Sequence, residues 1–167
     1  MTHVGITGHQ RLANPEAWPW VASVMQGELT KMSPPLVGVT SLAIGADQLL
    51  ARLVLQLGGA IHAVLPYADI ERSFSPADVQ DFKVLVKQAT VEVLDTPGTD
   101  DDAYLAAGQR VVDLSDVVLA VWDGKPAQGK GGTADVVAYA IRRGVRLIHI
   151  DPIARTVRKP GDQEQRP

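Results

Sequence analysis

The feature that most constrains this chain is the regular alternation of short apolar runs with longer amphipathic segments. The apolar runs predict strands at residues 4–7, 36–40, 60–65, 90–94, 117–122 and 145–150. The segments between them predict helices at residues 16–31, 45–57, 77–88, 101–114 and 133–143. Strands that alternate with helices pair in parallel through right-handed crossovers. Residues 117–121 are apolar without alternation, which is typical of a strand covered on both faces.

This pattern predicts an α/β fold, a single doubly wound Rossmann-like domain with a mainly parallel sheet of about six strands. The length of 167 residues fits one domain, which we place at residues 1–151. Residues 152–167 are polar and bounded by prolines, and we expect them to form a mobile C-terminal tail. Asn14 and Ser75, each followed by a proline, are the expected caps of two helices.

The composition excludes several classes of protein. The chain has no cysteine, which excludes disulfides, thiolate metal sites and a thiol nucleophile. A net charge of -3 and the lack of a basic run in the body of the chain disfavour nucleic acid as a partner. No apolar run approaches the roughly 18 residues of a membrane span, and the N-terminus lacks the pattern of a signal peptide. We therefore expect a soluble cytoplasmic protein without a membrane partner.

Known cofactor and metal motifs are also missing. The four histidines are scattered along the chain, so we expect no metal site. Neither G-x-G-x-x-G nor G-x-x-x-x-G-K-[ST] occurs, which argues against a nicotinamide dehydrogenase and a P-loop enzyme. No cofactor is implied beyond a nucleotide held as a ligand.

The glycines gather in three predicted strand-to-helix loops, at residues 5–11, 40–47 and 123–133. Seven of the 15 lie there, namely Gly5, Gly8, Gly45, Gly124, Gly129, Gly131 and Gly132. In an open parallel sheet, ligands bind beyond the carboxyl ends of the strands, where such loops meet. The glycines therefore indicate one ligand site at that edge of the sheet.

The third loop carries the strongest indication of a site. Gly131 and Gly132 come directly before a predicted helix, so their N–H groups can face an anion at the positive end of the helix. The Thr133 hydroxyl can donate to the same anion. The alternative is an ordinary flexible loop with Thr133 as the helix cap, and the residue types leave both open.

The other two loops and the end of the fifth strand add further candidates. We assign as ligand-binding residues Gly8, His9 and Arg11 from the first loop, Ser41 and Gly45 from the second, and Asp123, Lys125 and Lys130 from the third. Ser41 and Gly45 would form the floor, Asp123 would orient a ribose hydroxyl, and the lysines would add positive charge. The alternatives are a solvated turn for the first loop and, for the second, a tight turn with Asp47 as the helix cap.

Taken together, the three loops resemble the SLOG superfamily, which unites DNA-processing protein A with the Lonely-guy phosphoribohydrolases. Residues 40–47, TSLAIGAD, resemble the S-G-x-A-x-G-[IA]-D segment of DNA-processing protein A. Residues 115–121, SDVVLAV, resemble the S-D-x-x-[IL]-A-[LV] strand of the Lonely-guy enzymes, and residues 131–133 resemble their P-G-G-x-G-T phosphate loop. The resemblance runs from about residue 3 to residue 150. It implies a Rossmann-like fold that binds nucleotides or nucleotide-derived ligands.

The chain departs from the catalytic pattern of the Lonely-guy enzymes. These enzymes hydrolyse the N-glycosidic bond of nucleoside monophosphates with a glutamate three residues after the loop threonine and an arginine on the preceding helix. Val136 and Ala107 stand at the corresponding positions here. Asp135 and Arg110 are the nearest replacements, and they are therefore the candidate catalytic residues.

Three functions follow from the residues and the resemblance. The leading hypothesis is a protein that binds a nucleotide or nucleotide-derived phosphate ligand, as a sensor or carrier. The alternative is a phosphoribohydrolase that cleaves nucleoside 5′-monophosphates to base and ribose 5-phosphate, with Asp135 assisting water and Arg110 holding the phosphate. A single-stranded DNA-binding module is disfavoured by the acidic charge and by the 5% aromatic content. The resemblance also implies a homodimer or higher homo-oligomer, for which the apolar helix at residues 45–57 is a candidate interface.

Overall fold

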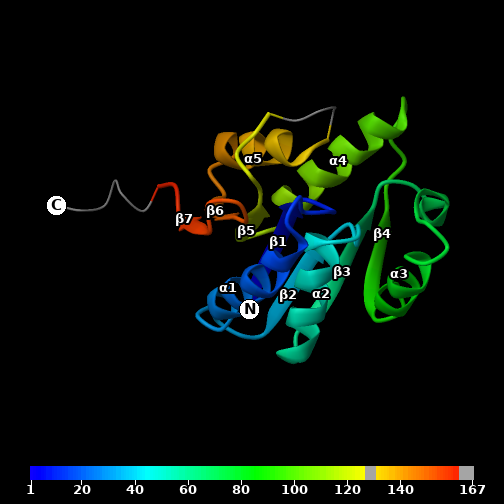
Figure 1. The fold of residues 1–167 in the computed structure, drawn as a ribbon. Coiled ribbons are helices and arrows are strands. Elements are labelled where there is room, and N and C mark those ends of the chain that lie inside the picture. The colour runs from blue at the N-terminus through cyan, green and yellow to red at the C-terminus, as the bar shows by residue number, and fades with distance from the viewer. Residues whose placement is uncertain (127–130, 162–167) are drawn as a thin grey trace.

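A seven-stranded sheet forms the centre of the computed structural model, which describes residues 1–126 and 131–161. The strands are β1 (Thr2–Gly8), β2 (Leu36–Thr40), β3 (Ala60–Leu65), β4 (Ala89–Val93), β5 (Val117–Val121), β6 (Arg146–Asp151) and β7 (Thr156–Arg158). Their order across the sheet is β4-β3-β2-β1-β5-β6-β7 (Figure 1). Neighbouring strands pair in parallel, except that β7 runs antiparallel to β6.

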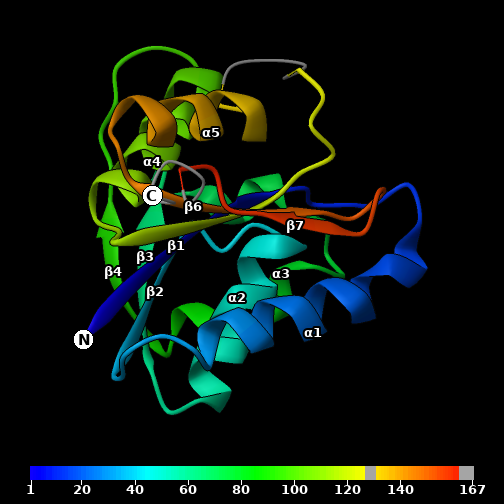
Figure 2. The same ribbon diagram turned by 90° about the vertical axis from the view of Figure 1, so that its left-hand side faces the viewer.

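Helices cover both faces of this sheet. The helical segments are η1 (Pro15–Ala17), α1 (Trp18–Leu29), α2 (Ala46–Gln56), η2 (Ile70–Ser73), α3 (Val79–Val86), α4 (Asp100–Asp113) and α5 (Thr133–Arg142). Figure 2 shows α1, α2 and α3 on one face and α4 and α5 on the other. The predicted fold class, a single doubly wound α/β domain with a mainly parallel sheet, is confirmed.

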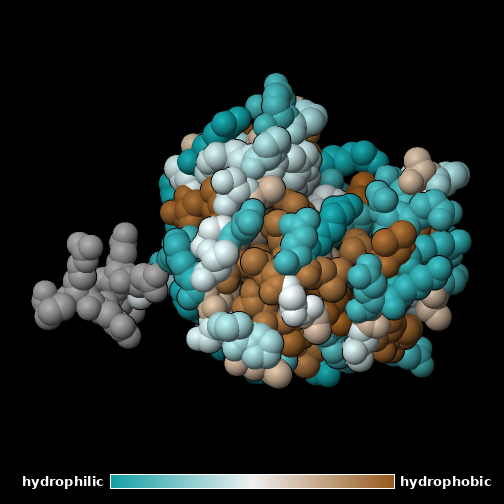
Figure 3. Space-filling view, turned by 90° about the horizontal axis from the view of Figure 1, so that it is seen from below, coloured by the Kyte–Doolittle hydropathy of each residue, from teal (hydrophilic) through white to brown (hydrophobic). Residues whose placement is uncertain are grey.

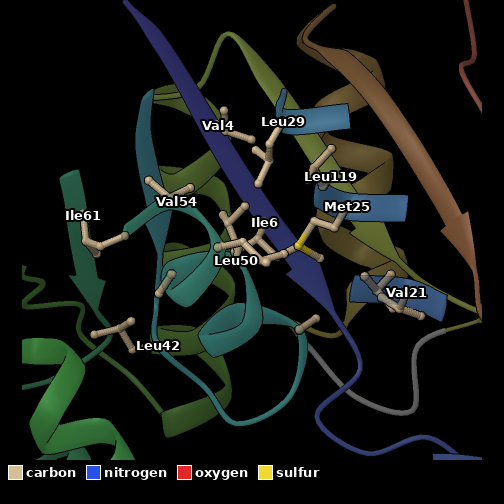
Figure 4. Packing of buried hydrophobic residues seen from close by; sticks show 14 of the residues in the cluster. Val4, Ile6, Val21, Met25, Leu29, Leu42, Leu50, Val54, Ile61 and Leu119 are labelled. Carbon is tan, nitrogen blue, oxygen red and sulfur yellow. The ribbon is translucent and has the colours of Figure 1, made fainter. Parts of the chain in front are cut away.

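The hydrophobic core lies on both sides of the central strands. Successive side chains of a strand point to opposite faces, so β5 contributes Leu119 to the side of α1 and α2 and Val118 to the side of α5. Both faces of β5 are buried, which explains its continuous apolar run. Figure 4 shows Leu119 with Val4 and Met25 in the larger cluster.

Helix α2, which was predicted as an interface, buries most of its apolar side chains in the core. Leu50, Leu53 and Val54 are buried in the core. Figure 3 shows the molecule from below the view of Figure 1, on the side where α1 and α2 lie. Apolar residues still cluster in the centre of this face. A groove of about 390 Å³ lies between these helices, lined by Trp18, Pro19, Ala22, Gly45, Leu49 and Arg52. The predicted homo-oligomer stays a prediction.

Strand β7 corrects the expectation of a tail that begins at residue 152. It pairs with β6 so that Val157 lies opposite Ile150. Directly after β7, Lys159 Nζ lies 3.0 Å from Glu28 Oε2, and this ion pair links the end of β7 to α1. Three residues are too few to show a period of two, and backbone pairing needs no particular side chains, so the sequence pattern missed this strand. Residues 162–167 of the expected tail lie outside the described residues.

The helix starts differ from those expected at Asn14 and Ser75. The side chain of Asn14 makes no capping hydrogen bond, and a turn of 3₁₀-helix separates it from α1. Ser75 Oγ accepts the Asp78 N–H at 3.2 Å, but α3 begins only at Val79. Thr99, which the sequence analysis did not name, caps α4 in a reciprocal capping box with Asp102.

Candidate functional site

The three glycine-containing loops line a single cleft of about 950 Å³ at the carboxyl edge of the sheet. The chain order reverses there, because β1 lies between β2 and β5. Ligands of doubly wound folds bind at such a switch point. Of the predicted ligand-binding residues that the structure describes, all but Gly45 line the cleft, namely Gly8, His9, Arg11, Ser41, Asp123, Lys125, Gly131, Gly132 and Thr133. Lys130 lies outside the described residues.

The amino end of α5 presents free backbone donors to this cleft. Within residues 1–126 and 131–161, the N–H groups of Gly132, Thr133 and Ala134 have no hydrogen-bond partner. All three residues line the cleft. The first N–H groups of a helix have no partner inside it, and they carry the positive end of its dipole. This end of α5 can therefore hold an anion.

Asp135 is engaged with the loop rather than with the cleft. Its Oδ2 accepts the Gly131 N–H at 3.1 Å, and Asp135 does not line the cleft. The Gly131 amide is thus already used, and the free donors are those of the next three residues. A Cβ on Gly131 would lie 2.7 Å from the Leu105 N of α4, so glycine lets this loop pack closely on α4. Val136 lines the cleft instead of a carboxylate.

Arg110 also lies away from the cleft lining. Its Nε donates to Glu92 Oε1 at 2.8 Å, and the other oxygen of Glu92 lies 3.0 Å from His62 Nε2. The hydrogen bond from Arg110, with that of His62, lowers the pKa of Glu92 below its usual value. Ala107, one turn away on α4, is buried in the core. The structure therefore brings neither candidate catalytic residue to the cleft.

Asp123 and His9 meet where β5 and β1 end. The Asp123 N–H donates to His9 Nε2 at 3.2 Å, and Asp123 Oδ1 accepts the Lys125 N–H at 3.0 Å. Burial acts to raise the pKa of Asp123, but the Lys125 N–H bond and nearby positive charge outweigh it, so the pKa lies below its usual value. Among the described residues, Asp123 Oδ2 has no partner, which leaves it able to accept a ligand hydroxyl.

Asp47 is a buried carboxyl group beside the cleft. It is the second residue of α2, and its Oδ2 accepts the N–H groups of Ser41 at 3.2 Å and Ala43 at 3.4 Å. Burial raises its pKa to about 7, against the opposing effect of these hydrogen bonds. Asp47 thus ties the β2–α2 loop to α2 and holds Ser41 at the cleft. The tight turn that was the alternative for the second loop is present, but Asp47 is not the cap of α2, because Gly45 holds the N-cap position and no side chain caps this helix.

Gly45 joins the first and second loops behind the cleft rather than forming its floor. Its φ is +83°, and a Cβ there would lie 2.3 Å from the Gln10 carbonyl oxygen and 2.6 Å from that of His9. The next residue, Ala46, donates its N–H to the His9 carbonyl at 3.2 Å. Only glycine tolerates both this backbone conformation and this close approach.

The segment before α3 completes one side of the cleft. Arg11 Nη2 lies 3.5 Å from Asp78 Oδ2, and Ser75 Oγ donates to the same carboxylate at 2.8 Å. Phe74, Ser75 and Asp78 line the cleft, but they were not predicted as ligand-binding residues because their segment matches no motif. Tyr104 of α4 was also missed, although it shares one helix face with Gly108 and Val111, which line the cleft too.

The fold is similar to those of three solved structures. DNA processing protein A (DprA) from Streptococcus pneumoniae superposes with a TM-score of 0.66 at 20% identity, covering 89% of this chain and 50% of that chain. DprA from Helicobacter pylori gives 0.64 at 17% identity, covering 89% and 64%. The structural genomics target TM1055 gives 0.56 at 16% identity, covering 88% and 72%. This chain thus spans about half to two thirds of the two DprA chains.

No protein-family model matches the chain, and no curated protein matches it in sequence. At these low identities, the similarity to solved structures shows the fold. The resemblance to DNA-processing protein A is confirmed for the fold, which DprA shares over most of this chain. Among the residues that the structure describes, no helix combines the length and the apolar character needed to span a bilayer. The same part of the chain holds no group of three side chains placed to bind a metal ion.

Proposed function

We propose that this chain binds a nucleotide or nucleotide-derived ligand, with a phosphate of the ligand at the amino end of α5. The observation that carries the proposal is the set of three unpartnered N–H groups, on Gly132, Thr133 and Ala134, that line the cleft. Backbone donors at a helix start bind phosphate through both hydrogen bonds and the helix dipole.

Side chains around these donors fit the rest of a nucleotide. The Thr133 hydroxyl and the Lys125 ammonium group can reach the same anion, and Asp123 Oδ2 can accept a ribose hydroxyl. Arg11 is 77% exposed, and exposed ion pairs such as Arg11–Asp78 contribute only about 0–1 kcal/mol, so a phosphate can draw the guanidinium away. Lys125 and Arg11 therefore add positive charge to that of the helix end.

We propose binding, as a sensor or carrier, in preference to glycosidic hydrolysis. The hydrolytic alternative depends on Asp135 to assist the attacking water and on Arg110 to hold the phosphate. Asp135 accepts the Gly131 N–H and Arg110 pairs with Glu92, while Val136 faces the cleft. The residues on which the hydrolytic alternative depends are thus engaged elsewhere.

Single-stranded DNA is a less suitable ligand than a small nucleotide. The Helicobacter pylori DprA structure is described as showing a single-stranded DNA binding mode of that protein. This chain has a net charge of -3 and 5% aromatic residues. Proteins that bind single strands combine a positively charged groove with aromatic side chains on which successive bases stack. The composition therefore supports a small ligand.

Isothermal titration calorimetry with AMP, ADP, GMP and CMP tests the proposal. Wild-type protein should bind at least one of these nucleotides, and Gly132→Asp should weaken that binding at least about tenfold, because its carboxylate would repel the phosphate. The φ of Gly132 is -68° at the N-cap of α5, where aspartate is a favoured residue, so the variant should fold normally.

Gly27→Asp is the matched control for this experiment. Gly27 is exposed in α1, and a Cβ added there meets nothing within 4 Å. The control adds the same charge away from the cleft and should leave nucleotide affinity unchanged. Equal affinities for wild type and Gly132→Asp, or no binding of any of the four nucleotides, would refute the proposed function.

A further inference from the structure

We infer that the cleft is built for a ligand with two ring systems joined through phosphate, which is the chemical class of a dinucleotide. This inference rests on the proposed function, since it takes the phosphate site at α5 as given. The additional observation is that an apolar wall stands at each end of the cleft, and that the phosphate site lies between the two walls.

The first wall follows β3 and presents aromatic rings. Ile70 and Phe74, from the segment between β3 and α3, line the cleft with Tyr104 of α4. Phe74 packs on Phe82 with ring centroids 4.9 Å apart, so its ring is supported from behind. The Tyr104 hydroxyl lies 2.8 Å from that of Tyr67, which fixes the Tyr104 ring. Supported aromatic faces are suitable for stacking a base.

The second wall follows β5 and β6. Trp122, Pro152 and Ile153 line the cleft there. The Trp122 indole N–H donates to the Lys125 carbonyl at 2.9 Å. Asp151 Oδ1 accepts the Ile153 N–H at 2.8 Å and so holds the turn between β6 and β7. Ile153 is nevertheless 60% exposed, and an exposed apolar side chain on a fixed turn beside a cleft is suited to cover an apolar ligand group.

The two walls lie on opposite sides of the phosphate site. In the sheet order, β5, which leads into the α5 donors, stands between β3 and β6. In Figure 1 the segment from β3 to α3 is on the right and β6 and β7 are on the left. Four strand spacings separate β3 from β6, or about 19 Å at about 4.8 Å per spacing.

One nucleotide therefore reaches only one wall. With its phosphate at α5, its base extends toward β3 or toward β6, and the other wall stays uncovered. A second nucleoside on the same phosphate or pyrophosphate would cover it. The cleft volume of about 950 Å³ lies near the upper end of the range for ligand pockets, about 300–1,000 Å³, which fits the larger ligand.

Calorimetry with ADP and diadenosine 5′,5′-diphosphate tests the inference, because both carry a pyrophosphate but only the second carries two rings. Diadenosine diphosphate should bind at least about tenfold more tightly than ADP. Phe74→Leu, which keeps apolar packing on Phe82 but removes the aromatic face, should weaken diadenosine diphosphate binding by about fivefold or more. Ile153→Ser should weaken it similarly, whereas only one of the two variants should weaken ADP binding.

Ile141→Ser serves as the control, because Ile141 of α5 is 58% exposed and does not line the cleft. It should leave both affinities unchanged. Diadenosine diphosphate that binds no more tightly than ADP, or that is insensitive to either wall variant, would overturn the inference while the proposed function stands. If neither ligand binds, both claims fail for adenine nucleotides.

Discussion

Single residues at the cleft hold the loops in place and leave three backbone N–H groups free. Asp135 accepts the N–H of Gly131, and Asp47 accepts those of Ser41 and Ala43, so two carboxylates organise two loops. Asp135 prevents the Gly131 amide from serving a ligand but leaves the three amides after it available. The charge of Asp47 depends on pH in the neutral range, because burial raises its pKa to about 7.

Asp47→Asn should change how stability depends on pH. The raised pKa means that the folded state holds a proton that the unfolded state, with a pKa of 3.8, releases, so wild type loses stability as pH rises from about 4 to about 7. Asparagine keeps an acceptor oxygen and has no charge to bury. Relative to the variant, the free energy of unfolding of the wild type, measured with urea, should fall by up to about 4 kcal/mol between pH 4 and pH 8. A difference that does not vary with pH would contradict this account of Asp47.

Gly45→Ala should be markedly more destabilising than Gly58→Ala. Both glycines have positive φ, +83° and +76°. Alanine is unfavourable in this backbone conformation, so both variants should lose about 1–2 kcal/mol of stability from it. Only at Gly45 would the new Cβ also collide with backbone, that of His9 and Gln10, while nothing lies within 4 Å at Gly58. Urea unfolding should show a further loss of at least about 1 kcal/mol for Gly45→Ala. Equal losses would show that the two loops do not pack as closely as described.

Among the elements, α4 and α5 form the side of the cleft opposite α2. The start of α4 is fixed by the capping box of Thr99 and Asp102, which was not among the predicted caps. Strands β1 to β6 were predictable to within two residues because apolar runs mark them directly, whereas the three-residue β7 was not predicted. The capping residues of the helices were less predictable. The 3₁₀-helix η1 separates Asn14 from α1, and only the three-dimensional contacts decide which polar side chain caps a helix.

Thr99→Ala and Asn14→Ala test this assignment of caps. Loss of the Thr99 hydroxyl removes a bond to the Asp102 N–H and should destabilise the protein by about 1 kcal/mol. Asn14→Ala should cost less than about 0.5 kcal/mol, because Asn14 makes no capping bond. Thermal or urea unfolding of the two variants checks the difference. A larger loss at Asn14 than at Thr99 would reverse the assignment.

For the whole molecule, the order of the strands decides which loops share the site. The position of the cleft was predictable, because parallel strands bring their carboxyl ends to one edge and glycines mark the loops there. The partners of individual side chains were not predictable. Nothing local in the sequence pairs Arg110 with Glu92, and no motif marks Phe74 or Ile153, which reach the cleft only through the tertiary fold.

The amide resonances of ¹⁵N-labelled protein, followed by NMR during titration with AMP and separately with adenosine, test the central claim most directly. AMP should shift the amide resonances of Gly132, Thr133 and Ala134 more than those of other residues. Adenosine, which lacks the phosphate, should leave these three nearly unchanged. Equal shifts with both ligands, or AMP shifts confined to residues away from the amino end of α5, would contradict phosphate binding at this site.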